Sequence, residues 1–203
     1  MCLGARRRRS AAPTPSDITS SYGVILKETT ALSPSVPVSN ASPLIHMSRL
    51  GKLRFAQMVF SNVFIPAAVR RETIEAGAKK GFADVSALEK LEDDGWLVTS
   101  PLSKRSLGVA DALSKGLGRG ESEAIALALE RKERLFMDDQ KGRAAARLYG
   151  VETATTLGLI LEMRKKGSMG LDEYQRNVKE YGSRGWIGAD VVQLYLEKGR
   201  ELG

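Results

Sequence analysis

The chain has 203 residues, which is enough for one domain with a sizeable core and a tail. Its shares of hydrophobic residues (42%) and charged residues (27%) are ordinary for a globular protein, and no apolar run approaches the roughly 18–20 residues that span a bilayer. We therefore expect a cytoplasmic protein without a membrane partner. The single cysteine, Cys2, and the single histidine, His46, exclude an internal disulfide and a histidine-rich metal site, and they argue against a Ser-His-Asp triad.

The formal net charge is +7, of which residues 1–35 contribute +3 through five basic and two acidic side chains. The remaining +4 lies on the rest of the chain. A mildly basic domain suits a polyanionic partner such as RNA, but simple solubility explains the charge equally well.

Residues 1–35 differ from the rest of the chain in composition. A run of four arginines, Arg6 to Arg9, is followed by sequence rich in Ser, Thr, Ala and Pro. Such a segment cannot bury enough apolar surface to offset its ordering entropy, so we expect a disordered basic tail. Its role is open between a passive tail, a nucleic-acid-binding arm and a targeting segment.

From Val36 onward, short apolar runs alternate with amphipathic segments of about ten residues. The first helix is expected to have Ser42 as N-cap and Pro43 at its first position, and to end before Gly51. In chain order, the predicted elements are a strand over 36–39, this first helix, a strand over 63–65, a helix from Pro66 to about Ala76, a helix over 83–93, a strand over 96–99, a helix over 107–114, a loop over 116–120, a helix over 121–131, a strand over 135–137, a helix through Leu148 that ends at Gly150, a strand over 151–154, and helices over 156–166, 171–181 and 189–198.

This alternation predicts an α/β fold with a central parallel sheet of about five short strands that is covered by helices on both faces. We expect the folded domain to span residues 36–167. The helices over 168–203 are expected to pack on this domain or on a second subunit. In open parallel sheets, binding sites form beyond the carboxyl ends of the strands, so residues that follow strands are the first candidates for a functional site.

Polar and acidic residues occupy several of these positions. Asn40 follows the first predicted strand, and Asp138 and Asp139 follow the fourth. Glu121 begins the helix after the glycine-rich loop, and Glu72 lies about two turns into the helix that follows the second strand. If these side chains converge on one patch, their mutual repulsion requires a cation. Mg²⁺ and Mn²⁺ prefer such oxygen ligands, and a bound metal can activate water for attack on a phosphodiester.

Each of these residues also has a structural interpretation. Glu121 and Glu123 in the first turn of a helix favour its dipole, and Asp138 and Asp139 can cap the helix that follows the fourth strand. Glu72 is also compatible with a solvated helix surface. Taken one at a time, the structural interpretation is the better one for every residue, and only their combination favours a site.

Four segments of the chain follow one another in the order VSNASPLIHMSRLGKL, VFIPAAVRRETIEAG, LGRGESEAIALALE and LFMDDQKGRAAARLYGVETATTLGLILEMRKKG. In this order they resemble four blocks of PIN domains, in the bacterial and archaeal subgroup of predicted nucleic-acid-binding proteins. The resemblance extends from about Val36 to Gly167 and is weaker from there to the end.

The resemblance implies a compact three-layer α/β fold and a magnesium- or manganese-dependent ribonuclease related to the VapC toxins of toxin–antitoxin pairs. It also implies RNA as substrate, a small antitoxin protein as partner, and a homodimer. The implied metal ligands are Asn40, Glu72, Glu121 and Asp139, the last three also being the implied catalytic residues. Asp138 and Glu123 are close enough in the motif to take the place of one of these ligands.

The chain departs from the usual PIN pattern at Asn40, where most PIN nucleases have Asp. An amide oxygen can still bind a metal, but it is neutral, so catalysis is less certain than metal binding. Two alternatives to a ribonuclease therefore remain open. One is a nucleic-acid-binding module without catalysis, and the other is a protein-interaction module.

Four further residues lie near the expected site. Ser42 and Thr155 are candidates for positioning water or phosphate, although an N-cap is the better interpretation of Ser42. Arg143 fits either a phosphate contact or an ion pair with the nearby acids. His46 is interpreted as a helix residue without a chemical role.

Overall fold

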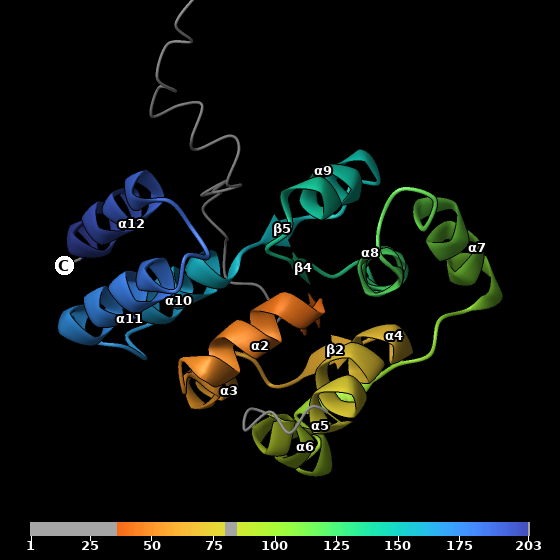
Figure 1. Ribbon diagram of the computed structural model, residues 1–203, viewed down its shortest axis with the longest axis horizontal. Helices are drawn as coiled ribbons and strands as arrows, with labels where there is room; N and C mark the ends of the chain where they lie inside the picture. Colours follow the sequence, from red (N-terminus) through yellow and green to blue (C-terminus); the bar gives the residue numbers. More distant parts are fainter. Residues whose placement is uncertain (1–35, 80–84, 203) are drawn as a thin grey trace, which may run out of the picture.

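The computed structural model describes residues 36–79 and 85–202, so the predicted tail over residues 1–35 lies outside the described residues. Every neighbouring pair of strands is parallel, and the strand order is β3-β2-β1-β4-β5. The structure confirms the predicted α/β fold with a parallel sheet of five short strands flanked by helices (Figure 1). The strands are β1 (Val38–Ser39), β2 (Val63–Ile65), β3 (Leu97–Thr99), β4 (Leu135–Phe136) and β5 (Thr153–Ala154).

Helix α2 packs on α3, α6 and α10, and α8 packs on α4, α7 and α9. The helical segment after β2 runs without a break through α4, a π-helical turn η1 and α5. The helices are α2 (Ala41–Arg49), α3 (Leu53–Val59), α4 (Ala67–Arg70), η1 (Arg71–Glu75), α5 (Ala76–Lys79), α6 (Val85–Asp93), α7 (Lys104–Leu113), α8 (Arg119–Arg131), α9 (Gln140–Leu148), α10 (Thr156–Lys165), α11 (Leu171–Ser183) and α12 (Ala189–Glu201).

The central strands are apolar because both faces of the sheet are covered. Val38, Ile65 and Leu135 have no exposed surface. The same is true of Ile125 on α8 and Ile160 on α10, which belong to the same core. Strands that are buried on both sides are recognised in the sequence as short continuous apolar runs rather than as alternating patterns. This is why the sequence located the three central strands.

The start of the first helix was predicted wrongly. The N-cap is Asn40 rather than Ser42, and Pro43 is the third helical residue rather than the first. The chain turns into the helix directly at the end of β1, and proline is tolerated throughout the first turn because the N–H groups there have no intrahelical acceptor. The predicted end is confirmed, since Gly51 follows the helix with a φ of 65°.

Two helices differ from the sequence prediction. Helix α3 was not predicted, and it buries Leu53 and Ala56. Helix α7 begins three residues before the predicted range, because Ser103 is its N-cap and accepts a hydrogen bond from the N–H of Ser106 at 3.3 Å. Helix α3 has only seven residues, so the pattern of apolar residues defines it poorly.

The order of the strands creates a switch point between β1 and β4. The chain continues from β1 to β2 on one side and from β4 to β5 on the other. A crevice forms at such a point, outside the carboxyl ends of the two strands. Asn40 lies there, since its N–H donates to the carbonyl oxygen of Phe136 at 2.9 Å and thereby extends the β1–β4 ladder.

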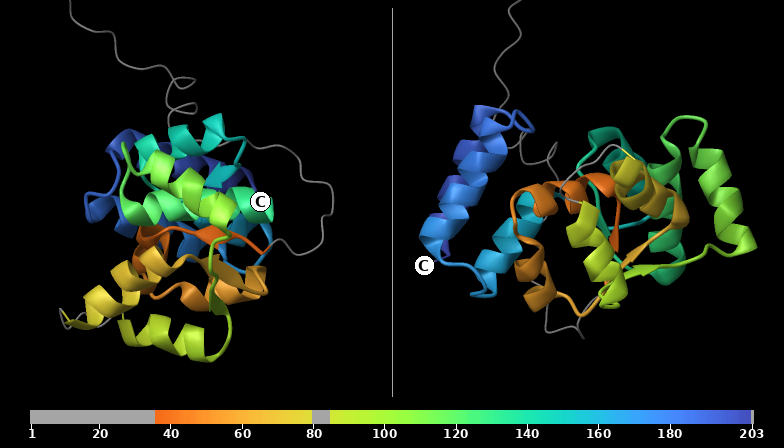
Figure 2. Two further views of the ribbon diagram at one scale, coloured as in Figure 1. Left: turned by 90° about the vertical axis from the view of Figure 1, so that its right-hand side faces the viewer. Right: turned by 60° about the horizontal axis from the view of Figure 1, so that its bottom comes forward.

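Helices α11 and α12 pack on each other and on α10 (Figure 2). An ion pair of 2.7 Å between Lys52 and Glu173 joins α11 to the loop before α3. The hydroxyl of Tyr174 donates to the carbonyl oxygen of Tyr195 at 2.6 Å and links the two C-terminal helices. Among the helices of the described residues, none is long and apolar enough to span a membrane.

Candidate functional site

Asn40 directly follows β1, but its side chain makes no capping hydrogen bond to α2. The residue is only 5% exposed, and its Oδ1 atom is buried without a hydrogen-bond donor among the described residues. Burying a carbonyl oxygen without a donor costs about 1–3 kcal/mol. A metal ion would satisfy this oxygen, so the Asn40 side chain fits the predicted metal site.

Asp139 is the N-cap of α9 and is exposed. Its Oδ1 accepts a hydrogen bond from the N–H of Gly142 at 2.6 Å. The prediction that Asp139 caps the helix after the fourth strand is therefore correct. A carboxylate has a second oxygen, and capping through Oδ1 is compatible with a metal contact through Oδ2.

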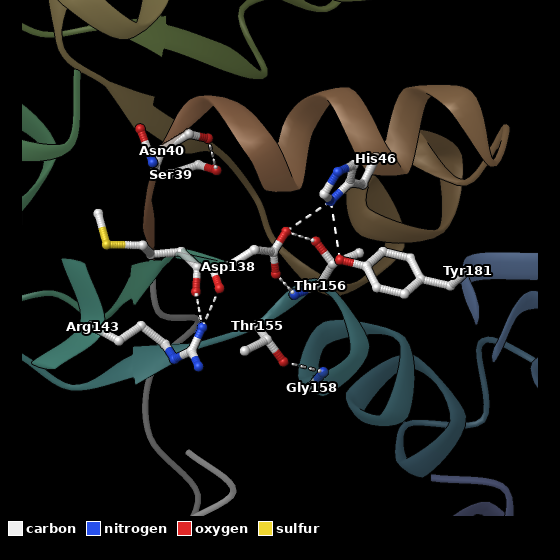
Figure 3. A network of polar contacts seen from close by, with 10 residues as sticks. Ser39, Asn40, His46, Asp138, Arg143, Thr155, Thr156, Gly158 and Tyr181 are labelled. Atoms are coloured by element: carbon white, nitrogen blue, oxygen red, sulfur yellow. Dashed lines mark hydrogen bonds and ion pairs between the residues drawn. The ribbon is translucent and has the colours of Figure 1, made fainter. Parts of the chain in front are cut away.

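Asp138, the residue before it, is held by three hydrogen bonds (Figure 3). Thr156 donates its N–H to Oδ1 at 2.7 Å and its hydroxyl to Oδ2 at 2.6 Å. The Nδ1 atom of His46 lies 2.8 Å from Oδ2. Because Thr156 is the first residue of α10, the carboxylate also lies at the positive end of that helix. These contacts suit Asp138 to supporting the site more than to binding a metal.

His46 is packed among aromatic side chains of the C-terminal region. Its ring stacks on Trp186, with 3.9 Å between ring centroids, and meets Tyr181 edge-on. Burial and the nearby charge of Asp138 raise the pKa of Tyr181, so its hydroxyl stays protonated. The interpretation of His46 as a helix residue without a role was incomplete. No local pattern could reveal that its partners lie more than 90 residues away along the chain.

Arg143 on α9 is almost fully buried. Its guanidinium donates to the carbonyl oxygens of Asp138 and Met137 (Figure 3). Burial lowers its pKa, and the negative charge of Asp138 opposes this shift. The buried Arg143 side chain therefore stabilises the turn between β4 and α9. A phosphate contact, one of its two predicted roles, does not fit a buried guanidinium.

Glu72 lies in the π-helical turn η1, a kind of turn that is frequent at functional sites. The residue is exposed, but its Oε1 accepts a hydrogen bond of 3.2 Å from the N–H of Gly120 on α8. Partial loss of hydration raises the pKa of Glu72, and the charges of Glu121 and Glu123 add to this increase. Gly120 allows the close approach, because a Cβ atom there would lie 2.5 Å from Oε2 of Glu72.

Glu121 and Glu123 both lie near the start of α8, but their surroundings differ. Glu121 lies in the first turn of the helix, as the dipole interpretation required, and it also accepts a hydrogen bond from the N–H of Gly118 at 3.0 Å. Glu123 is 4% exposed and accepts hydrogen bonds from the N–H of Ala68 at 3.0 Å and from Arg119 at 2.7 Å. Glu123 thus joins α8 to α4, and its carboxylate forms an ion pair with Arg119.

The predicted ligands form two neighbouring groups rather than one cluster. Asn40, Asp138 and Asp139 lie at the ends of β1 and β4, and Glu72 and Glu121 lie where α8 meets the helix after β2. Helix α8 packs on β1 and β4 and leads into β4, so its start lies at the same edge of the sheet. Within the described residues, however, no three acidic, histidine or cysteine side chains are close enough to hold one metal ion.

A small cavity of about 60 Å³ lies between Asp138 and the C-terminal helices. Thr155, which caps α10 through a 3.1 Å hydrogen bond from Gly158, forms part of its wall together with Tyr195. The volume suits a few water molecules, because an engineered cavity that holds benzene measures about 150 Å³. The cavity is therefore too small for a nucleobase.

Residues 36–201 match the model of the family DUF3368, described as a PIN domain. The match includes all five strands and both C-terminal helices. No curated protein matches the chain.

Proposed function

The chain belongs to the PIN-domain family, a family with a nuclease-type fold, and on this premise we propose that it is a metal-dependent endoribonuclease. The proposed ligands of Mg²⁺ or Mn²⁺ are Asn40, Glu72, Glu121 and Asp139, the last three being the proposed catalytic residues. Because the described carboxylates form no three-ligand group, some of them would reach the ion through the water molecules that Mg²⁺ usually keeps. Asp138 is not included, because three hydrogen bonds already engage its carboxylate. The toxin role, the antitoxin partner, the homodimer and the cytoplasmic location stay predictions.

The observation that carries the proposal is the buried Oδ1 atom of Asn40, which has no donor among the described residues. Folded proteins rarely leave such an oxygen unsatisfied, and those that do need an explanation. Its place between the ends of β1 and β4 is the crevice where open parallel sheets bind their ligands. A cation bound there explains both the position of the atom and its missing partner.

The side chains at the carboxyl-terminal edge of the sheet would have different roles in phosphodiester hydrolysis. When bound, the metal would polarise a phosphate oxygen and lower the pKa of a water molecule. Glu72 and Glu121 place negative charge at the start of α8, and Asp139 places it at the start of α9. The charge of Glu72 is partly desolvated, which strengthens its attraction for a cation relative to that of a carboxylate in water.

Substitution of Asn40 by aspartate is expected to tighten Mg²⁺ binding. The side chain keeps its shape, and a neutral ligand becomes an anionic one beside a hard cation. Without metal, the same substitution buries an additional carboxylate and is expected to lower the melting temperature. Isothermal titration calorimetry with Mg²⁺ and thermal unfolding with and without Mg²⁺ measure the two effects. An unchanged dissociation constant would count against Asn40 as a ligand.

The proposed activity is tested by incubating the purified full chain with a single-stranded RNA and a hairpin RNA in Mg²⁺, in Mn²⁺ and in excess EDTA. We expect cleavage in at least one of the two metals, no cleavage in EDTA, and recovery when metal is restored. Cleavage that persists in EDTA would contradict a metal-dependent mechanism. A labelled DNA of the same sequence distinguishes a ribonuclease from a general nuclease.

A second function is favoured by two observations. Position 40 has a neutral amide, and the described carboxylates do not form a three-ligand group. Both suit a module that binds RNA without cutting it. This alternative predicts that RNA affinity falls steeply with salt, as release of counterions requires, and that no metal produces cleavage. Filter binding at two salt concentrations, run beside the cleavage assay, separates the two functions.

A further inference from the structure

The carboxylate of Asp138 is held by residues from two other elements. Thr156 contributes two donors from the start of α10, and His46 contributes one from α2 (Figure 3). Since a carboxylate can only accept, Nδ1 of His46 is assigned the proton. The Asp138 side chain is 15% exposed, so water competes little with these donors.

The ring of His46 is in turn held by the C-terminal helices. It lies against Trp186, in the loop between α11 and α12, and against Tyr181 on α11. The hydroxyl of Tyr181 is 3.0 Å from Nδ1. The orientation of the imidazole therefore depends on the docking of α11 and α12 on the rest of the domain.

The main chain of Asp138 is also fixed. Arg143 donates to its carbonyl oxygen and to that of Met137. Asp139, a proposed metal ligand, is the next residue, and its own side chain caps α9. The side chain and the main chain of Asp138 are therefore both held where the turn that presents Asp139 begins.

From these contacts, and resting on the proposed function, we propose that His46 is a positioning residue. It holds Asp138, and through Asp138 the β4–α9 turn, in the orientation that lets Asp139 bind the metal. The C-terminal helices thereby belong to the functional site although they carry none of its proposed ligands. Residues that orient metal ligands in this way typically contribute about 10–100-fold to affinity or activity.

Two substitutions of His46 separate the hydrogen bond from the stacking. His46→Phe keeps an aromatic ring on Trp186 and removes the donor to Asp138. His46→Asn keeps a nitrogen donor close to the place of Nδ1 and removes the ring. The binding of Mn²⁺ alone is measured by calorimetry, and the melting temperature of each metal-free variant shows whether it folds.

We expect His46→Phe to weaken Mn²⁺ binding by about tenfold and His46→Asn to retain most of the affinity. Thr156→Val removes the second donor to the same oxygen of Asp138 and nearly keeps the shape of the side chain. We expect it to weaken Mn²⁺ binding to a similar degree. If His46→Phe does not fold, this variant still shows whether the hold on Asp138 affects metal binding. Equal affinity of the unsubstituted chain, His46→Phe and Thr156→Val would overturn the positioning role alone. So would a greater loss in His46→Asn than in His46→Phe. A full chain that binds no Mn²⁺ overturns the proposed function as well.

Discussion

Substitution of Asp139 by asparagine is expected to reduce RNA cleavage by more than about 100-fold while the protein stays folded. Removal of a ligand should cost more than removal of a residue that only orients one, which typically costs about 10–100-fold. Asparagine is as good an N-cap as aspartate, so the hydrogen bond from Gly142 that begins α9 can persist. The loss should therefore appear in the cleavage rate and in Mn²⁺ affinity rather than in the melting temperature.

The matched control is Asp172→Asn. Asp172 lies in the first turn of α11 and is exposed, so the same chemical change at a helix start is made away from the strand ends. We expect normal cleavage from this variant. Full activity of Asp139→Asn would remove Asp139 from the proposed site, and equal loss in both variants would indicate an effect of net charge on RNA binding rather than on the metal.

Substitution of Gly120 by alanine is expected to impair metal binding without weakening the fold. The added Cβ would lie 2.5–2.6 Å from both carboxylate oxygens of Glu72, so this side chain must move and its hydrogen bond to the Gly120 N–H is disturbed. The flexible end of Glu72 can move without disturbing the core. Alanine also favours a helix by about 1 kcal/mol relative to glycine. A misplacement of about 1 Å can cost on the order of 100-fold in rate.

Gly116→Ala is the control for this substitution. It lies in the same glycine-rich loop, and a Cβ there meets nothing within 4 Å. The cleavage rate, the dissociation constant for Mn²⁺ and the melting temperature are compared for both variants and for Glu72→Gln. We expect Gly120→Ala to resemble Glu72→Gln, and Gly116→Ala to resemble the unsubstituted chain. Normal cleavage by both Gly120→Ala and Glu72→Gln would leave Glu72 as a surface residue that only contacts α8.

The two groups of predicted ligands depend on different parts of the structure. Asn40 and Asp139 belong to strand ends, and their positions follow from the sheet. Glu72 and Glu121 belong to two helices, and their separation depends on how α8 packs against the helix after β2. The two substitutions therefore test the groups independently, since Asp139→Asn changes the strand group and Gly120→Ala changes the helix group.

The local interpretation of Asp139 was correct, because this residue caps α9. Thr155 caps α10 and Glu121 accepts from the N–H of Gly118, and neither of these local bonds was predicted. Each of these bonds spans three residues, so the sequence contains both partners side by side. The N-cap of α2 was misjudged because the tight turn from β1 into the helix, rather than the side chain at Ser42, decides where that helix begins.

The sequence by itself determined the five strands, the alternation with helices, and the places where polar residues follow strands. These depend on periodicity and on short-range hydrogen bonds. Only the tertiary structure decided that β1 lies beside β4, that Glu72 reaches Gly120, and that His46 holds Asp138. The physical reason is that such contacts join segments 48 and 92 residues apart, and no local pattern records which distant side chain will complete a hydrogen bond.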